Sequence, residues 1–315
     1  MTTSSKLKTL NYFKGLDELI GKTPLLEIRH SRSNKVKIFA KCEWVNPSGS
    51  IKDRVAISIF KDALEKDLLL NKILIDATSG NTGVSLSMLG AVFQIPVELV
   101  IPENASLQNK LMIQNYGAKL HFTSPENGTD GAQWYLKNLI NEYPEIYYHP
   151  NQYSNCNNWK AHFNTTAPEI WSQTNNKITH FISGLGTSGT FVGVSKFLKE
   201  KNVKCVAVHP DSRNHGLQGW KYFKTEMIPS IYDNYIADKH VEVSTKTAYS
   251  FAKSAFCHLG LSLSPSSAGN LAAALNLSKE LNDGVIVTIF PDNASKYLQD
   301  IFWKDDNIKT ENPFF

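Results

Sequence analysis

Apolar and polar positions along the chain follow two periods, and the periods predict two kinds of element. Over 36–44 apolar residues recur at nearly every second position, as in a half-buried strand, and from Arg54 they recur along one helix face. Short apolar runs typical of buried strands follow at 72–76, 97–101, 178–183, 203–208 and 285–290. Helical patterns stand between them at 83–94, 106–116, 130–142, 188–200, 246–259 and 268–281. This alternation predicts an α/β protein with a largely parallel sheet.

Other local signals predict where elements end and where the chain is irregular. Gly117 and Gly260 stand where helix C-caps are expected. The stretch 209–240 is the least regular part, and long loops of this kind are often functional. The tail over 304–315 is polar with an apolar tip, so we expect it to be loosely held.

Composition narrows the class of protein. The 315 residues are 42% hydrophobic and 20% charged, which excludes disorder or a coiled coil as the main architecture. The 33 Lys+Arg and 29 Asp+Glu are scattered and leave a charge of +4, so they do not indicate nucleic-acid binding. The longest uncharged run, 77–97, carries too many polar residues for a membrane helix, and no apolar signal segment opens the chain. The four cysteines lie too far apart for a zinc or redox pair. We therefore expect a cytoplasmic protein without a metal site.

Four motifs follow predicted strands, at the strand ends where open α/β sheets bind ligands. The first, 46–54, carries Lys52 at the mouth of a helix. The helix dipole together with burial would lower the pKa of its amine and favour a Schiff base. The second, 77–83, combines small hydroxyl residues with glycines, and its backbone N–H groups suit a carboxylate or a phosphate. Taken singly, the first motif is also explained by an ordinary turn and the second by a capped helix.

The third motif, 184–190, leaves two interpretations open. It matches G-x-G-x-x-G between a strand and a helix, and Asp211 follows the next strand, as in a nicotinamide-dinucleotide fold. Against this, Thr187, Ser188 and Thr190 offer three hydroxyls, which suit a terminal phosphate better than a bridging pyrophosphate. A dinucleotide site would also leave the first two motifs unexplained.

The fourth motif, 264–270, again opens a helix and contains Ser266, which by itself is explained as an N-cap. Together the motifs supply a candidate Schiff-base lysine, an anion-binding turn, a phosphate loop and a late serine. An aldehyde cofactor with a phosphate arm, pyridoxal 5′-phosphate, needs these parts.

With these motifs in this order, the chain resembles the fold type II pyridoxal-phosphate enzymes, specifically the cysteine synthase and cystathionine β-synthase group. The resemblance runs from 20–25 to about Leu298, and 167–195 is most similar to the cysteine synthase B (O-acetylserine sulfhydrylase B) branch. It implies two open, twisted α/β domains with the cofactor in the cleft between them, usually in a homodimer. The expected division is a smaller, mobile domain (46–150), a larger cofactor-binding domain (16–45 plus 151–303) and a tail (304–315).

The resemblance also implies a role for each motif residue. Lys52 would hold the cofactor as a Schiff base and later carry the Cα proton, Asn81 would bind the ring hydroxyl, and Ser266 would meet the pyridine nitrogen. The residues expected to bind the cofactor phosphate are Gly186, Thr187, Ser188, Gly189 and Thr190. The residues expected to hold the substrate, through its carboxylate, are Thr78, Ser79, Gly80, Thr82 and Gln152.

The implied reaction is β-replacement on an activated L-serine. The donor would be O-acetylserine, with O-phosphoserine second, and sulfide or thiosulfate would give L-cysteine or S-sulfocysteine. Three alternatives remain: cystathionine or cyanoalanine synthesis by the same chemistry, a nicotinamide-dinucleotide oxidoreductase, and a catalytically silent binding partner. The intact Lys52 argues against the last.

Three segments depart from the family pattern. The fourth motif lacks the usual glycine-rich form, 292–298 stands in place of D-x-G-x-R-Y-L, and 216–221 replaces a paired-arginine loop. The third departure bears on the substrate's leaving group. Four basic residues are expected near the entrance, where one could bind a phosphate leaving group: Arg213, His215, Lys221 and Lys224.

Overall fold

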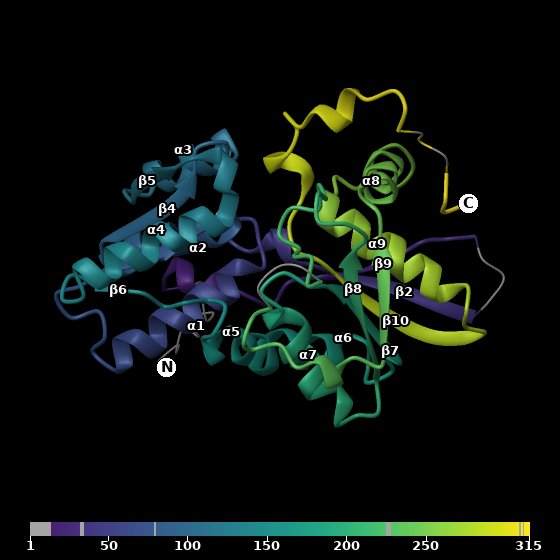
Figure 1. Ribbon diagram of the computed structural model, residues 1–315. Coiled ribbons are helices and arrows are strands. Elements are labelled where there is room, and N and C mark those ends of the chain that lie inside the picture. The colour runs from purple at the N-terminus through teal and green to yellow at the C-terminus, as the bar shows by residue number, and fades with distance from the viewer. Residues whose placement is uncertain (1–13, 32–34, 79, 225–227, 309, 311) are drawn as a thin grey trace, which may run out of the picture.

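The computed structural model describes residues 14–31, 35–78, 80–224, 228–308, 310 and 312–315. Over these ranges ten strands form two separate sheets, and helices cover both of them (Figure 1). The α/β class predicted from the sequence is therefore confirmed.

The larger sheet has six strands, and all its neighbouring pairs are parallel except the first. In spatial order the strands are β1 (Leu25–Ile28), β2 (Lys35–Cys42), β10 (Asp283–Phe290), β7 (His180–Gly184), β8 (Lys204–Pro210) and β9 (Lys239–Val243). Because β2, β10, β7 and β8 run in one direction, the segments that follow them meet at one edge of the sheet.

The smaller sheet has four parallel strands from the middle of the chain. In spatial order they are β5 (Lys119–Thr123), β4 (Val97–Pro102), β3 (Ile73–Ala77) and β6 (Tyr147–Tyr148). The motif that contains Asn81 follows β3 and therefore stands at the carboxyl edge of this sheet.

The α-helices are α1 (Lys52–Glu65), α2 (Asn81–Phe93), α3 (Leu107–Asn115), α4 (Gly128–Glu142), α5 (Cys156–Ala161), α6 (Ala167–Gln173), α7 (Gly189–Lys199), α8 (Thr245–Leu259) and α9 (Pro265–Ser278). A π-helical turn, η4 (His162–Thr166), joins α5 to α6. The short 3₁₀ turns are η1 (Leu16–Leu19), η2 (Glu43–Val45), η3 (Pro125–Asn127), η5 (Asn234–Ile236), η6 (Ala294–Lys296) and η7 (Ile301–Lys304). Within the described ranges no helix has both the length and the apolar character needed to cross a bilayer.

Each sheet has an apolar core on both faces. Along β8, Val206 and Val208 pack against α8 and α9, whereas Cys205 and Ala207 pack against the core under α7, as the two-residue period of a strand requires. Two further cores lie on the opposite faces of the smaller sheet. The domain boundaries expected from the sequence stay a prediction.

All the strands and helices expected from periodicity are present. Four of the elements that periodicity missed, β5, β9, α5 and α6, lack a clear apolar pattern. The short strand β5 and the strand β9, at one edge of each sheet, carry exposed residues, so they form no apolar run. The segment from α5 to α6 is rich in Asn and Thr and lacks the spacing of an apolar helix face. The prediction of a loosely held tail was wrong at the tip of the tail. Phe314 is 1% exposed and packs edge-on against Phe251, and its carbonyl accepts a hydrogen bond from the Ser31 N–H at 2.7 Å.

Candidate active site

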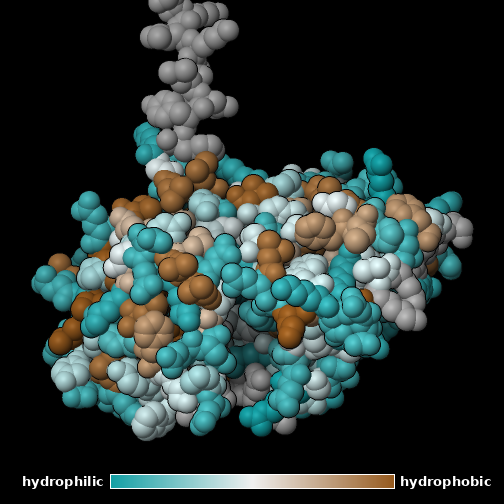
Figure 2. All heavy atoms as spheres, turned by 90° about the horizontal axis from the view of Figure 1, so that it is seen from above, coloured by the Kyte–Doolittle hydropathy of each residue, from teal (hydrophilic) through white to brown (hydrophobic). Residues whose placement is uncertain are grey.

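A cavity of about 790 Å³ lies among the carboxyl ends of strands from both sheets. Its wall includes residues that follow β3, β7, β8 and β10, together with the first turns of several helices. The volume is in the range of small-molecule and cofactor sites. The space-filling view shows the molecular surface hollowed between two halves of the molecule (Figure 2).

The cavity brings residues of all four motifs together. The predicted site residues in its wall are Lys52, Thr78, Gly80, Asn81, Thr82, Gly186, Thr187, Ser188, Gly189, Thr190 and Ser266. Gln152 does not line the cavity but accepts a hydrogen bond from the Thr82 hydroxyl at 3.0 Å, so it stands directly behind the wall. Ser79 lies outside the described residues.

Lys52 is the first residue of α1, and no side chain caps this helix. Lys52 lines the cavity. Burial lowers the pKa of its ammonium group below the usual range, although the negative charge of Asp292 acts in the opposite direction. A lowered pKa increases the fraction of neutral amine, which is the form that attacks an aldehyde carbon.

The helices α2 and α7 both begin at the cavity without a side-chain cap. The N-cap of α2 is Gly80, and the Thr78 hydroxyl accepts from the Gly80 N–H at 3.2 Å rather than from the helix. The N-cap of α7 is Ser188, whose φ of 67° is unusual for a residue with a side chain. Uncapped N-termini leave backbone N–H groups for an anion, so these two helix starts can bind a carboxylate and a phosphate.

Glycine is required in the loop before α7 because other groups approach its backbone closely. A Cβ on Gly186 would stand 2.0 Å from the carbonyl oxygen of Gly219, and one on Gly189 would stand 1.8 Å from Asn158 Oδ1. The loop is thus pressed between the 216–221 segment and α5. Neither position therefore has room for any side chain.

Ser266 stands in the first turn of α9 and is 3% exposed. The N-cap is Ser264, whose hydroxyl accepts from the Ser267 N–H at 3.2 Å. The N-cap explanation for Ser266 was therefore wrong. Its hydroxyl lines the cavity 3.3 Å from Ser264 Oγ and is left available for a ligand.

Two residues after β10, Asp292 and Tyr297, line the cavity, and Lys296 stands behind them; none of the three was predicted as a site residue. Asp292 accepts hydrogen bonds from Asn81 Nδ2 at 2.7 Å and from the Tyr297 hydroxyl at 2.5 Å. Lys296 donates to Asn81 Oδ1 at 2.6 Å. The rule that ligands bind beyond the carboxyl ends of parallel strands applied to β10 as well, and it was the signal that could have found them.

Two buried residues support the 184–190 loop, the candidate phosphate loop, from the helical side. Asn158 Nδ2 donates to the Gln152 carbonyl at 2.7 Å and to Thr187 Oγ1 at 3.0 Å. His162 Nε2 is 3.2 Å from the Thr190 hydroxyl, and burial holds the pKa of this imidazole well below its usual range, which keeps it neutral. Both lie in a segment without a regular apolar pattern, so the sequence carried no signal for them.

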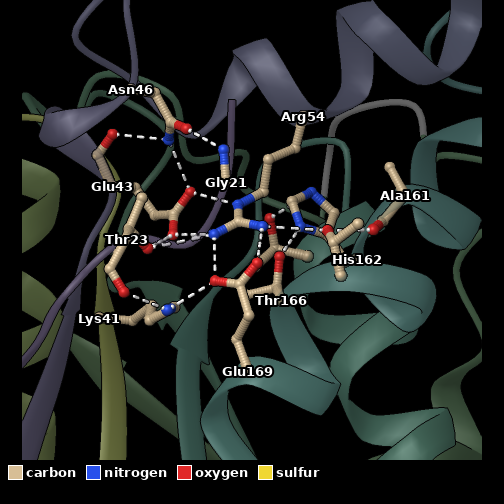
Figure 3. Close-up of polar contacts among 12 residues, drawn as sticks. Gly21, Thr23, Lys41, Glu43, Asn46, Arg54, Ala161, His162, Thr166 and Glu169 are labelled. Carbon is tan, nitrogen blue, oxygen red and sulfur yellow. Dashed lines mark hydrogen bonds and ion pairs between the residues drawn. The ribbon is translucent and has the colours of Figure 1, made fainter. Parts of the chain in front are cut away.

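An ionic cluster fastens the helix that carries Lys52 (Figure 3). Arg54 donates to Glu43 from Nε at 2.7 Å and to Glu169 from Nη1 at 2.8 Å, and Lys41 pairs with Glu169 at 2.7 Å. Burial by itself raises the pKa of Glu169, but the hydrogen bonds and charge of Arg54 outweigh it and lower the pKa to about 2. The cluster ties α1 to the end of β2 and to α6.

The basic residues expected near the entrance separate into two groups. Arg213, His215 and Lys221 line the cavity, and the Lys221 ammonium lies 5.0 Å from the centre of the Tyr153 ring. Lys224 does not line it, so the expectation for this residue was wrong. Its ammonium pairs with Glu242 of β9 at 2.7 Å, which holds the side chain away from the entrance.

Comparison with known proteins agrees with this geometry. The signature of the family described as pyridoxal-phosphate dependent enzyme matches residues 16–292. A cysteine synthase from Aquifex aeolicus is 42% identical, with 91% of each chain covered, and cysteine synthase B from Escherichia coli is 34% identical, with 90% of this chain and 94% of the relative covered. The crystal structure of a cysteine synthase from Entamoeba histolytica has a TM-score of 0.89 and 31% identity, and the match covers 100% of this chain and 97% of that one.

These matches confirm the resemblance seen in the sequence and the fold type II architecture that it implied. They leave the nicotinamide-dinucleotide alternative without support. The chain therefore belongs to the pyridoxal-phosphate dependent enzyme family, within its cysteine synthase and cystathionine β-synthase group.

Proposed function

We propose that this enzyme is a cysteine synthase, which replaces the acetate of O-acetyl-L-serine with sulfide and releases L-cysteine. The observation that carries the proposal is the position of Lys52. This residue lines a cavity that gathers all four motifs, and burial lowers the pKa of its amine, which increases the neutral fraction. Relatives named cysteine synthase that match over about nine-tenths of both chains support it.

The donors around the cavity fit pyridoxal phosphate. The uncapped start of α7 and the hydroxyls of Thr187 and Thr190 suit the phosphate arm, as expected from the resemblance. Asn81 supports binding of the ring hydroxyl, and the Ser266 hydroxyl supports binding of the ring nitrogen. When bound, the cofactor supplies an electron sink for negative charge at the substrate Cα.

The chain's own groups do the positioning and the proton transfer. Lys52 Nζ anchors the cofactor's aldehyde carbon and, once released, accepts the Cα proton as a general base. The uncapped start of α2, with the Thr78 and Thr82 hydroxyls, would orient the substrate by its carboxylate, and Gln152 would hold the Thr82 hydroxyl in place. Acetate would leave from Cβ, hydrosulfide would add at the same carbon, and Lys52 would return its proton to Cα, which gives L-cysteine.

An assay of the purified protein with added pyridoxal phosphate tests this proposal. The expected protein is yellow and forms cysteine from O-acetylserine and sulfide. Parallel reactions with thiosulfate, homocysteine and cyanide determine the preferred nucleophile. A yellow protein that yields cystathionine from homocysteine but no cysteine from sulfide would overturn the cysteine synthase assignment while leaving the cofactor intact.

Ser266→Asp is expected to lower kcat/KM for cysteine formation about tenfold more than Ser266→Ala. A carboxylate beside the ring nitrogen would hold it protonated, and the charge-assisted hydrogen bond is stronger than one from a neutral hydroxyl. The stronger electron sink diverts substrate into side reactions, which is measured as pyruvate formed per cysteine. Wild-type kinetics in both variants would show that the ring does not lie against Ser266.

Lys221→Ala is expected to leave kcat/KM for O-acetylserine within about twofold and to lower it about ten- to a hundredfold for O-phosphoserine. The ammonium lines the cavity, and a charge-assisted contact to a phosphate leaving group is worth about 1.5–3 kcal/mol. Lys224→Ala is the matched control, since Lys224 is paired with Glu242 instead. Equal losses for both donors would refute a role that depends on the leaving group.

We also propose a cytoplasmic homodimer in which the 46–150 domain moves against the rest of each chain. The resemblance to the family supports these three points. Light scattering of the purified protein tests the homodimer, and small-angle scattering with and without substrate tests the domain movement.

A further inference from the structure

Four side chains form one hydrogen-bonded group at the cavity wall: Asn81, Asp292, Lys296 and Tyr297, here called the Asn81 cluster. Its members come from the start of α2 and from the segment after β10. Asp292, Lys296 and Tyr297 are 1%, 7% and 4% exposed, so water does not compete for these bonds. Asn81 and Lys296 lie 215 positions apart in the sequence.

The two charged members dictate how the Asn81 amide is turned. An ammonium group can only donate, so Lys296 must face the carbonyl oxygen, Oδ1, at 2.6 Å. An ionised carboxylate can only accept, so Asp292 must face the amide nitrogen, Nδ2, at 2.7 Å. One N–H of Nδ2 is thereby used, and the second N–H remains for the Tyr297 hydroxyl or for a ligand in the cavity. Asn81 therefore acts toward the cavity as a donor.

Lys296 also connects the amide to the segment that carries the candidate Schiff-base lysine. Its ammonium donates to the Ser48 carbonyl at 3.0 Å, four residues before Lys52. Burial lowers the pKa of Lys296, and the charges of Asp292 and Asp53 oppose that shift. The charge of Asp292 thus acts on both Lys52 and Lys296.

We propose that Lys296 is a positioning residue that holds Asn81 as a donor and so selects the deprotonated form of the cofactor's ring oxygen. An N–H donor bonds more strongly to an oxyanion than to a neutral hydroxyl, so an Asn81 held as a donor stabilises the deprotonated ring oxygen over the protonated one. The positive charge of the ammonium favours the same form. The inference rests on the placement of the ring against Asn81 proposed above.

Absorption spectra of Lys296→Met loaded with pyridoxal phosphate test this inference. The lysine-linked cofactor absorbs in the visible when its ring oxygen is deprotonated and in the near ultraviolet when it is protonated. We expect the visible-to-ultraviolet ratio at neutral pH to fall about tenfold, which corresponds to about 1.4 kcal/mol. Lys296→Arg, which keeps the charge and the donors, is expected to restore the ratio. Lys296→Gln, whose amide N–H can still donate to Asn81 but which carries no charge, is expected to give a smaller fall than Lys296→Met.

Lys41→Met is the matched control, since Lys41 is a buried lysine that, like Lys296, does not line the cavity, but it bonds to Glu169 and the Thr23 carbonyl rather than to Asn81. It should lower the melting temperature and leave the spectrum unchanged. A Lys296→Met protein with full cofactor content and the wild-type ratio would overturn the inference, and so would a Lys296→Arg protein whose ratio falls as far as that of Lys296→Met. A wild-type protein without any visible band after loading would instead overturn the proposed function, so the two failures are distinguishable.

Discussion

Replacing Lys52 with alanine is expected to lower kcat/KM for cysteine formation by about 10³- to 10⁴-fold or more. A positioned general base contributes about 10²–10⁴-fold, and the covalent anchor of the cofactor is lost as well. The visible band of the lysine-linked cofactor should disappear with the activity. Both changes are measured on one preparation, by absorbance and by cysteine formed from O-acetylserine and sulfide.

The fold should survive this substitution, because Lys52 begins its helix and lines the cavity rather than the core. Lys61→Ala is the matched control: it removes an exposed lysine of the same helix and should keep wild-type kinetics and colour. Activity in Lys52→Ala within tenfold of wild type would refute the role assigned to this amine. An unchanged melting temperature excludes misfolding as the cause of the loss.

Arg54→Met is expected to cost about 3–5 kcal/mol of stability, because it leaves buried carboxylates without their counter-charge. The guanidinium makes hydrogen bonds at 2.7 and 2.9 Å to Glu43 and at 2.8 Å to each oxygen of Glu169. Glu43 is 0% exposed, so water cannot replace the lost partner. Urea titration of the wild type and the variant measures the difference.

Lys119→Met is the comparison for this result. Lys119 pairs with Glu98 at 3.2 Å, but its side chain is 64% exposed, and exposed pairs contribute about 0–1 kcal/mol. Adding Glu43→Gln to Arg54→Met should recover part of the loss, since it removes one unpaired charge. A cost below about 1 kcal/mol for Arg54→Met would contradict the assignment of this cluster as the fastening of α1.

The segment that replaces the paired-arginine loop, 216–221, packs against the 184–190 loop, the candidate phosphate loop. A Cβ on Gly184 would stand 2.0 Å from Trp220 Cε2, and Lys221 N–H donates to the Leu185 carbonyl at 2.8 Å. Trp220 itself is 8% exposed and belongs to the core. Changes in this segment are therefore expected to affect cofactor binding and substrate choice together.

The sequence by itself determined the α/β class, most strands and helices, and the four motifs at strand ends. These features are encoded within a few residues, because apolar period, turn glycines and helix starts are local properties. Lys52 became a candidate in this way, from its place between a strand and a helix, and the role expected of it came from the four motifs together and from the resemblance. Among the four cations predicted at the entrance only Lys224 was misplaced, because its ion pair with Glu242 of β9 joins residues 18 positions apart across a loop.

Only the tertiary structure decided which distant groups meet. Lys296 reaches Asn81 over 215 residues and Arg54 reaches Glu169 over 115, since both pairs are formed by the way the two sheets and their helices pack together. The identity of the α9 N-cap was also beyond the sequence, which offered three serines within four residues. Hydrogen-bond partners of this kind depend on distances of a few tenths of an ångström, and no local pattern of apolar and polar residues carries that information.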